Sequence, residues 1–149
     1  MTLTPHFSFE ELTRTGQSAL QDANRREARD YTDKLRQVAE MLEVIRAKFG
    51  AVRVNSGFRG PAVNAAVGGS ATSQHSKGEA ADIVCPSTTV DELHRWIVVE
   101  SGLKFGQCIL EKPAGSAWVH ISLGAPYRDP KKCGESLAFD GKTYTPKRY

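Results

Sequence analysis

Apolar residues recur at helical spacing across the segment from Asn24 to Phe49. The intervals between them are four, three, four, three and four residues, and charged side chains fill most of the other positions. This spacing puts the apolar side chains on one face of an amphipathic helix. The pattern predicts one long helix over 24–49 that ends at Gly50 and buries the side chains of Tyr31, Leu35, Val38, Leu42, Ile45 and Phe49.

Two shorter helices are predicted from their end signals. Residues 8–11, SFEE, have the S-x-x-E form of a capping box, in which a hydroxyl and a carboxylate satisfy free amides of the first turn. A short helix is therefore expected to run to about Thr15 and to stop near Gly16. The segment from Asp91 to Ser101 has apolar residues close to helical spacing and is followed by Gly102, a common helix stop.

The remaining apolar runs predict strands. Val52 and Val54 alternate with polar residues, and 80–84 has the character of a buried strand that follows a loop from Ser73. The runs Phe105–Glu111 and Ala117–Leu123 flank five residues, KPAGS, and are typical of a β-hairpin. A helical turn is expected within the Gly-rich residues 64–69.

The segment 124–149 is rich in Pro, Lys, Gly and Tyr and has no long periodic stretch, so it is expected to be an ordered tail on the surface. The fold class predicted is α+β. Residues 1–149 are expected to form a single domain, in which a small, mostly antiparallel sheet packs against the long N-terminal helix and a second helix.

Size and charge narrow the classes of function. A chain of 149 residues has the usual size of one domain. Twenty Lys and Arg against 17 Asp and Glu give a net charge of +3, too small and too scattered to predict a nucleic-acid partner. No basic and apolar leader is recognised, and no window approaches the ~20 apolar residues of a membrane span, so no stable membrane insertion is expected. The three cysteines are expected to be reduced, with Cys85 a small core residue.

Two histidines and an aspartate are candidate metal ligands. His75 and Asp82 lie seven residues apart, and Gly78 between them permits a tight turn. In residues 118–122, WVHIS, the period of a strand puts His120 on one face with Trp118, opposite the apolar residues. A catalytic zinc site uses about three such ligands and keeps one position open for water. From the residues alone, a metal site and a pair of structural histidines are equally consistent; the two other histidines, His6 and His94, are expected to be structural or solvent-facing.

The same segments resemble a known family. Residues 73–82, SQHSKGEAAD, resemble the S-x-H-x-x-G-x-A-x-D signature of the zinc D-Ala-D-Ala carboxypeptidases and related phage peptidoglycan endopeptidases, and WVHIS resembles the second motif, W-x-H-x-S. SGFR at 56–59 and FGQCILE at 105–111 occur in the order that family uses. The resemblance covers about residues 6–123.

The resemblance implies roles for particular residues. It makes His75, Asp82 and His120 the ligands of a zinc ion, with water in the fourth position. Some relatives carry an acidic residue or a second histidine just before the last ligand, but here Ala117 and Trp118 occupy those positions and neither can titrate. Glu111 is therefore the candidate general base. Arg59 corresponds to an arginine near the substrate carbonyl or carboxylate, and the expected substrate-binding residues are Arg59, Ser73, Gln107 and Trp118.

The function implied is hydrolysis of an amide bond in the peptide stem of peptidoglycan, by a monomeric endolysin of a phage or prophage. Such a protein is made in the host cytoplasm and acts on the wall in the periplasm after release, or is carried on a phage particle. The alternatives are a D-Ala-D-Ala carboxypeptidase of the host wall, a non-catalytic zinc domain resembling the hedgehog fold, and a structural phage protein without metal. The bond cleaved stays open between L-Ala–D-Glu, D-Ala–diaminopimelate and D-Ala–D-Ala.

Overall fold

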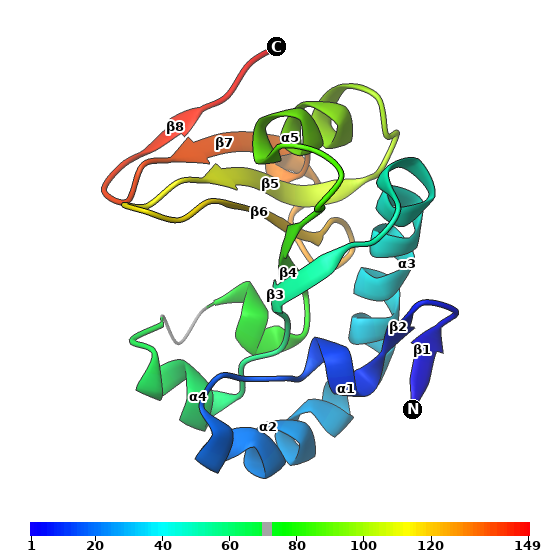
Figure 1. The fold of residues 1–149 in the computed structure, drawn as a ribbon, viewed down its shortest axis with the longest axis vertical. Coiled ribbons are helices and arrows are strands. Elements are labelled where there is room, and N and C mark those ends of the chain that lie inside the picture. Colours follow the sequence, from blue (N-terminus) through cyan, green and yellow to red (C-terminus); the bar gives the residue numbers. More distant parts are fainter. Residues whose placement is uncertain (70–72) are drawn as a thin grey trace.

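A sheet of six strands forms the centre of the computed structural model, which describes residues 1–69 and 73–149 (Figure 1). All neighbouring strands are antiparallel except β5 and β7, which are parallel. The predicted α+β class with a mostly antiparallel sheet is therefore confirmed. In spatial order the strands are β3 (Arg53–Ser56), β4 (Ala80–Val84), β6 (Trp118–Leu123), β5 (Phe105–Glu111), β7 (Glu135–Phe139) and β8 (Tyr144–Pro146).

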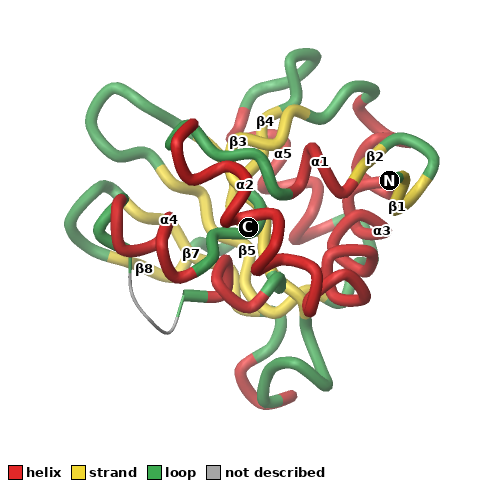
Figure 2. The backbone as a smooth tube through the Cα atoms, turned by 90° about the horizontal axis from the view of Figure 1, so that it is seen from below, coloured by secondary structure: helices red, strands yellow, loops and turns green. Residues whose placement is uncertain are grey.

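The helices and short turns come mainly from the first two thirds of the chain. The pair β1 (Thr2–Thr4) and β2 (Phe7–Ser8) forms a separate two-stranded sheet beside α3 (Figure 2). The α-helices are α1 (Phe9–Leu12), α2 (Gln21–Ala28), α3 (Thr32–Phe49), α4 (Pro61–Ala66) and α5 (Val90–Val99). Turns of 3-10 helix occupy Ser18–Leu20, Arg29–Tyr31, Gln74–Lys77 and Pro130–Lys132.

The central sheet has one face in the hydrophobic core and one face that carries polar side chains. Ile83 pairs with Val119 across β4 and β6, and both are fully buried with apolar residues of α3 and α5. Each such aliphatic side chain contributes about 1.5–3 kcal/mol by burial. Because side chains alternate along a strand, the neighbouring pair, Asp82 and His120, points to the opposite face.

The predicted long helix over 24–49 is wrong in one respect, since the helical segment begins earlier and is interrupted. A 3-10 turn at Arg29–Tyr31 separates α2 from α3, and the two helices run in different directions (Figure 1). The turn lets Tyr31 pack on Phe58, with 5.4 Å between ring centroids, and reach the backbone of Gly78. Of the six side chains predicted to be buried, Tyr31 and Phe49 are only partly buried, whereas the other four, Leu35, Val38, Leu42 and Ile45, are fully buried.

Local hydrogen bonds determine the observed ends of the shorter helices. Ser8 Oγ accepts from the backbone N–H of Glu11 at 3.0 Å, so the half of the predicted capping box that the serine hydroxyl makes is confirmed. α1 ends at Leu12 rather than near Thr15, and the carbonyl of Leu12 accepts from the N–H of Phe58 at 2.8 Å. α5 spans 90–99 instead of 91–101, and α4 begins at Pro61, before the predicted turn.

The tail expected over 124–149 is ordered, but it contains two strands that the sequence did not predict. β7 and β8 extend the main sheet, with Gln107 paired with Glu135 in the parallel ladder. The end of the segment is attached to the core through His94, whose Nδ1 lies 2.6 Å from the Tyr149 hydroxyl and whose Nε2 lies 3.0 Å from the carbonyl oxygen of Cys108. His94 is fully buried and structural, as expected.

The other expectations on side chains are met. His6 is exposed and pairs with Glu43 at 2.8 Å. The three cysteines are free thiols, and Cys85 is buried in the core. Within the described parts of the chain, no helix is both long and apolar enough to cross a membrane.

Candidate metal centre

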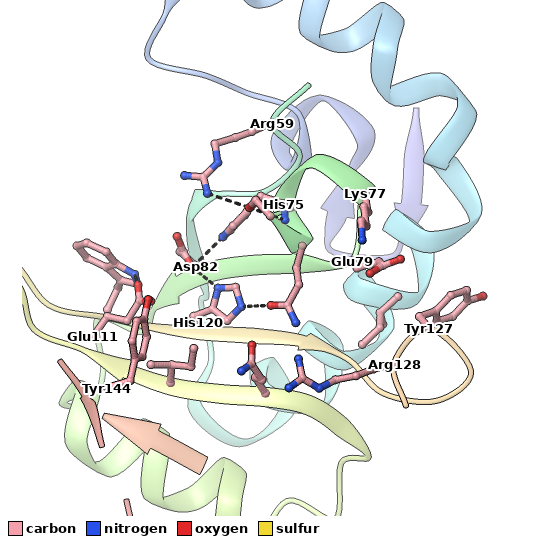
Figure 3. Close-up of a pocket in the computed structure, with 16 residues that line it drawn as sticks. Arg59, His75, Lys77, Glu79, Asp82, Glu111, His120, Tyr127, Arg128 and Tyr144 are labelled. Carbon is pink, nitrogen blue, oxygen red and sulfur yellow. Dashed lines mark hydrogen bonds and ion pairs between the residues drawn. The ribbon is translucent and has the colours of Figure 1, made fainter. Parts of the chain in front are cut away.

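His75, Asp82 and His120 meet on the polar face of the sheet. All three are buried, and each offers a ligand atom within 4.8 Å of those of the other two. His75 lies in the 3-10 turn Gln74–Lys77, Asp82 at the middle of β4, and His120 directly opposite it on β6 (Figure 3). Antiparallel pairing of β4 and β6 thus brings together residues that lie 38 apart in the chain.

The turn that carries His75 is fixed at both ends. Ser73 Oγ accepts from the N–H of His75 at 3.2 Å, which caps the turn. Gly78 ends it with φ of +70°, a conformation that costs other residues strain. A Cβ at Gly78 would lie 2.8 Å from the Cβ of Tyr31, so glycine is also needed for space.

Hydrogen bonds fix the tautomer of each imidazole. Nδ1 of His75 lies 2.8 Å from the carbonyl oxygen of Gly57, and Nε2 of His120 lies 2.7 Å from Oε1 of Gln74. Both oxygens are acceptors, so these two nitrogens carry the protons. The lone pairs of His75 Nε2 and His120 Nδ1 then face Oδ1 of Asp82, at 3.2 and 2.9 Å respectively.

The carboxyl group of Asp82 is ionised. Burial by itself raises its pKa, but where the two imidazoles are instead protonated toward Asp82, the charge of His75 and the hydrogen bonds from His120 and His75 outweigh burial and hold the pKa well below its ordinary value. Two imidazoles with directed lone pairs and one carboxylate form the donor set of a catalytic zinc site, and the outer hydrogen bonds are those that orient metal ligands. The three residues therefore fit a zinc ion and leave one coordination position open.

Glu111 lies on the same face of the sheet. It pairs with Trp118 across β5 and β6, and the indole N–H of Trp118 donates to its Oε2. Burial, and next the negative charge of Asp82, raise the pKa of the Glu111 carboxyl. A carboxylate with a raised pKa beside a metal site is suited to accept and return a proton.

Arg59 belongs to the loop that follows β3. It lies on the other side of the metal-binding group from β5, the strand that carries Glu111 (Figure 3). Its backbone N–H donates to the carbonyl of His75 at 3.0 Å, and its Nη2 makes a long contact of 3.5 Å with Ser73 Oγ. Its Nε is buried and has no hydrogen-bond partner among the described residues. A guanidinium whose buried Nε has no partner can donate hydrogen bonds to an anionic or carbonyl group of a ligand.

All the residues predicted for the site line one cleft of about 580 Å³. The cleft also holds residues that the sequence did not single out, namely Gln74, Lys77, Glu79, Ile109, Leu123, Tyr127, Arg128 and Tyr144. Gln74 stands next to His75 inside the recognised motif, which is a signal that could have found it. Tyr127, Arg128 and Tyr144 come from the tail, where no sequence pattern marks them.

The donor set and the open cleft fit the metal site of a metallohydrolase. A protein-family model described as Peptidase M15 matches residues 5–122, and the chain belongs to this family. Its members are zinc-dependent metallopeptidases that act on peptidoglycan. The match includes the three candidate ligands, Arg59 and Glu111, while residues 123–149 lie beyond it. No curated protein matches the chain.

Proposed function

We propose that this protein hydrolyses an amide bond within the peptide stem of peptidoglycan, and that it does so as a phage or prophage endolysin. The observation that carries the hydrolytic part is the convergence of two imidazole lone pairs and one ionised carboxylate in a cleft that also contains Glu111. The proposed setting is a monomer that is made in the host cytoplasm and acts on the periplasmic wall after release.

In this proposal His75, Asp82 and His120 hold the zinc ion. Zinc in such a site lowers the pKa of a water molecule and polarises a carbonyl group. The protein contributes the fixed tautomers, which Gly57 and Gln74 maintain, so the nitrogens that face Asp82 are the ones available to a metal.

Glu111 acts as the general base and then as the general acid. It takes a proton from the attacking water as the oxygen bonds to the scissile carbonyl carbon, and it gives the proton to the amine when the C–N bond breaks. The hydrogen bond from Trp118 keeps the carboxylate directed while leaving its other oxygen available. The raised pKa of Glu111 makes its carboxylate a stronger base for the first of these proton transfers.

Arg59 binds the carbonyl oxygen as negative charge develops on it, or a carboxylate of the substrate. Its unpaired buried Nε supports this role, because burial of a donor without a partner costs free energy that a bound ligand recovers. A non-catalytic zinc domain would need neither this donor nor Glu111. A D-Ala-D-Ala carboxypeptidase remains the second candidate, since Arg59 is also suited to a terminal carboxylate.

The experiment is digestion of purified sacculi by the zinc-loaded protein, followed by mass spectrometry of the released muropeptides. One new amine and one new carboxyl group at a single stem position are expected. Glu111→Gln should bind zinc with unchanged stoichiometry and release no products. Intact muropeptides with the zinc-loaded wild type contradict the proposed reaction, and full activity of Glu111→Gln contradicts the role of the base.

A further inference from the structure

Arg128 brings a second guanidinium to the cleft from outside the family match. It belongs to the segment that connects β6 to β7, and it lines the same cleft as the three candidate ligands. Arg59 and Arg128 lie on opposite sides of the group formed by His75, Asp82 and His120 (Figure 3). A peptide that crosses the metal-binding group therefore meets one arginine on each side of it.

Hydrogen bonds and close packing fix the position of the Arg128 side chain. Its Nε donates to the carbonyl of Lys132 at 2.9 Å, and its Nη2 donates to Oε1 of Glu135 at 3.0 Å. The side chain is only 21% exposed. Space for it depends on Gly106, where a Cβ would lie 3.0 Å from Cδ of Arg128 and 2.4 Å from the carbonyl oxygen of Leu123.

Glu135 couples Arg128 to a residue that the sequence predicted for substrate binding. The same oxygen, Oε1, also accepts from Nε2 of Gln107 at 2.6 Å, so one carboxylate orients two side chains of the cleft wall. Glu135 itself is not part of the lining. Among the described residues Nη1 of Arg128 has no hydrogen-bond partner, and it remains available to a ligand.

The charge of this end of the cleft favours an anion. Lys77 lines it and forms no ion pair within the described chain. Arg128 is paired with Glu135 at 3.0 Å and the lining carboxylate of Glu79 with Lys34 at 2.6 Å, so Lys77 is a positive charge at this end that no described carboxylate neutralises. Arginine can hold a carboxylate by two parallel hydrogen bonds, and such charge-assisted bonds are stronger than those between neutral groups.

We propose that Arg128, supported by Glu135 and Gln107, binds a carboxylate of the stem peptide on the side of the scissile amide opposite to Arg59. This inference rests on the proposed function and names a determinant of its specificity. Two carboxylates of the stem have the required chemistry, the α-carboxylate of D-Glu and the free carboxylate of diaminopimelate. Recognition of either one selects unamidated stems over amidated ones.

The test compares three synthetic stem peptides with the zinc-loaded, full-length protein. One peptide carries both carboxylates, and each of the others has one of them replaced by a carboxamide. For one of the two carboxamides, kcat/KM of the wild type should fall about 10- to 100-fold, mainly through KM. Arg128→Gln should lose this preference, so that its kcat/KM values for the unamidated and the sensitive amidated peptide agree within about twofold.

Two further variants separate recognition from structure. Lys132→Gln removes a nearby exposed charge but keeps the carbonyl that Arg128 uses, so its preference should equal that of the wild type. Arg128→Lys keeps the charge without the planar fork and should retain only part of the preference. If Arg128→Gln lowers kcat/KM equally for all three peptides, Arg128 is structural and the proposal is wrong.

Binding to Glu111→Gln, measured calorimetrically with the same peptides, distinguishes failure of the subsite from failure of the proposed reaction. Cleavage by the wild type without any preference overturns the subsite alone. Preferential binding of the unamidated peptide without cleavage by the wild type overturns the reaction and upholds the subsite. If the stem peptides are neither bound nor cleaved, both the subsite and the proposed reaction are overturned.

Discussion

Gln74 should control the zinc affinity of the site, although it is not a ligand. Its Oε1 is the acceptor for Nε2 of His120 at 2.7 Å, and this hydrogen bond leaves Nδ1 as the unprotonated nitrogen that faces Asp82. The corresponding acceptor for His75 is the backbone carbonyl of Gly57, which substitution cannot remove. Gln74→Met keeps the length of the side chain and deletes the acceptor.

The magnitude follows from this loss. Removal of an outer hydrogen bond to a metal-bound histidine typically weakens metal binding by 10- to 100-fold. At ~1.4 kcal/mol for each factor of ten, the stabilisation by saturating zinc should fall by about 1.4–2.8 kcal/mol. In a chain of 149 residues, where 1 kcal/mol shifts the melting temperature by ~2–4 °C, the zinc-induced rise should shrink by about 3–11 °C.

The assay is competition for zinc against a chromophoric chelator at fixed pH, combined with thermal melts with and without zinc. Ser76→Ala is the matched control, because it removes a side-chain hydrogen bond of 2.7 Å to the carbonyl of Ser73 in the same turn without touching His120. Its zinc affinity should stay within about threefold of the wild type. Gln74→Glu keeps an acceptor and should bind zinc at least as tightly. Wild-type affinity in Gln74→Met would refute the reasoning.

Other substitutions test other parts of the structure. Because burial and the charge of Asp82 raise the pKa of Glu111 in the metal-free protein, its carboxyl should titrate there above the ordinary value of about 4.5; an NMR titration of the metal-free protein that places it at or below this value contradicts the reasoning. Burial lowers the pKa of His94, so the unfolded state binds more protons below pH ~6.5, and stability should fall there by up to ~1.4 kcal/mol per pH unit. Urea unfolding should show this slope in the wild type and a smaller one in His94→Gln. Tyr149→Phe deletes the hydroxyl that contacts His94 and should lower the melting temperature by ~2–4 °C. An unchanged melting temperature would show that this contact does not stabilise the fold. Gly78→Ala should destabilise by ~1–3 kcal/mol more than Gly102→Ala, because both positions have positive φ but only Gly78 lacks space for a Cβ; equal melting temperatures would argue against this.

The sequence predicted the elements of the fold that have strong local patterns. The apolar face of α3 and the hairpin of β5 and β6 follow from periodicity and were predicted with small errors at their ends. The turn at Arg29–Tyr31 was missed because its apolar residue, Tyr31, keeps the helical spacing. The helix is interrupted there because the Tyr31 ring packs on Phe58, and a local sequence pattern does not reveal such a tertiary contact.

The two strands of the tail were missed for a related reason. β7 joins the sheet in parallel beside β5, so its partner lies 28 residues earlier in the chain. Its residues are all half-buried and show no alternation between apolar and polar positions that would mark one buried face. Short edge strands of this kind depend on non-local pairing, and propensity predicts them poorly.

The candidate metal centre was predictable as a set of residue types but not as a geometry. Motif resemblance pointed to His75, Asp82 and His120, and the structure brings them within 4.8 Å. The register that sets Asp82 opposite His120 depends on a strand pair closed over 38 residues. Gln74 was passed over because its contribution depends on which imidazole nitrogen it meets, which only coordinates reveal.

The two-faced sheet has a consequence for how such a sequence can change. Along β6, Trp118 and His120 face the cleft while Val119 and Ile121 are buried in the core. Adjacent codons are therefore subject to different requirements: one must preserve the chemistry of the cleft, and the next must preserve the packing of the core. An insertion or deletion of a single residue would exchange the two sets completely. Substitution can tune either property separately, but the length of this strand is fixed by both at once.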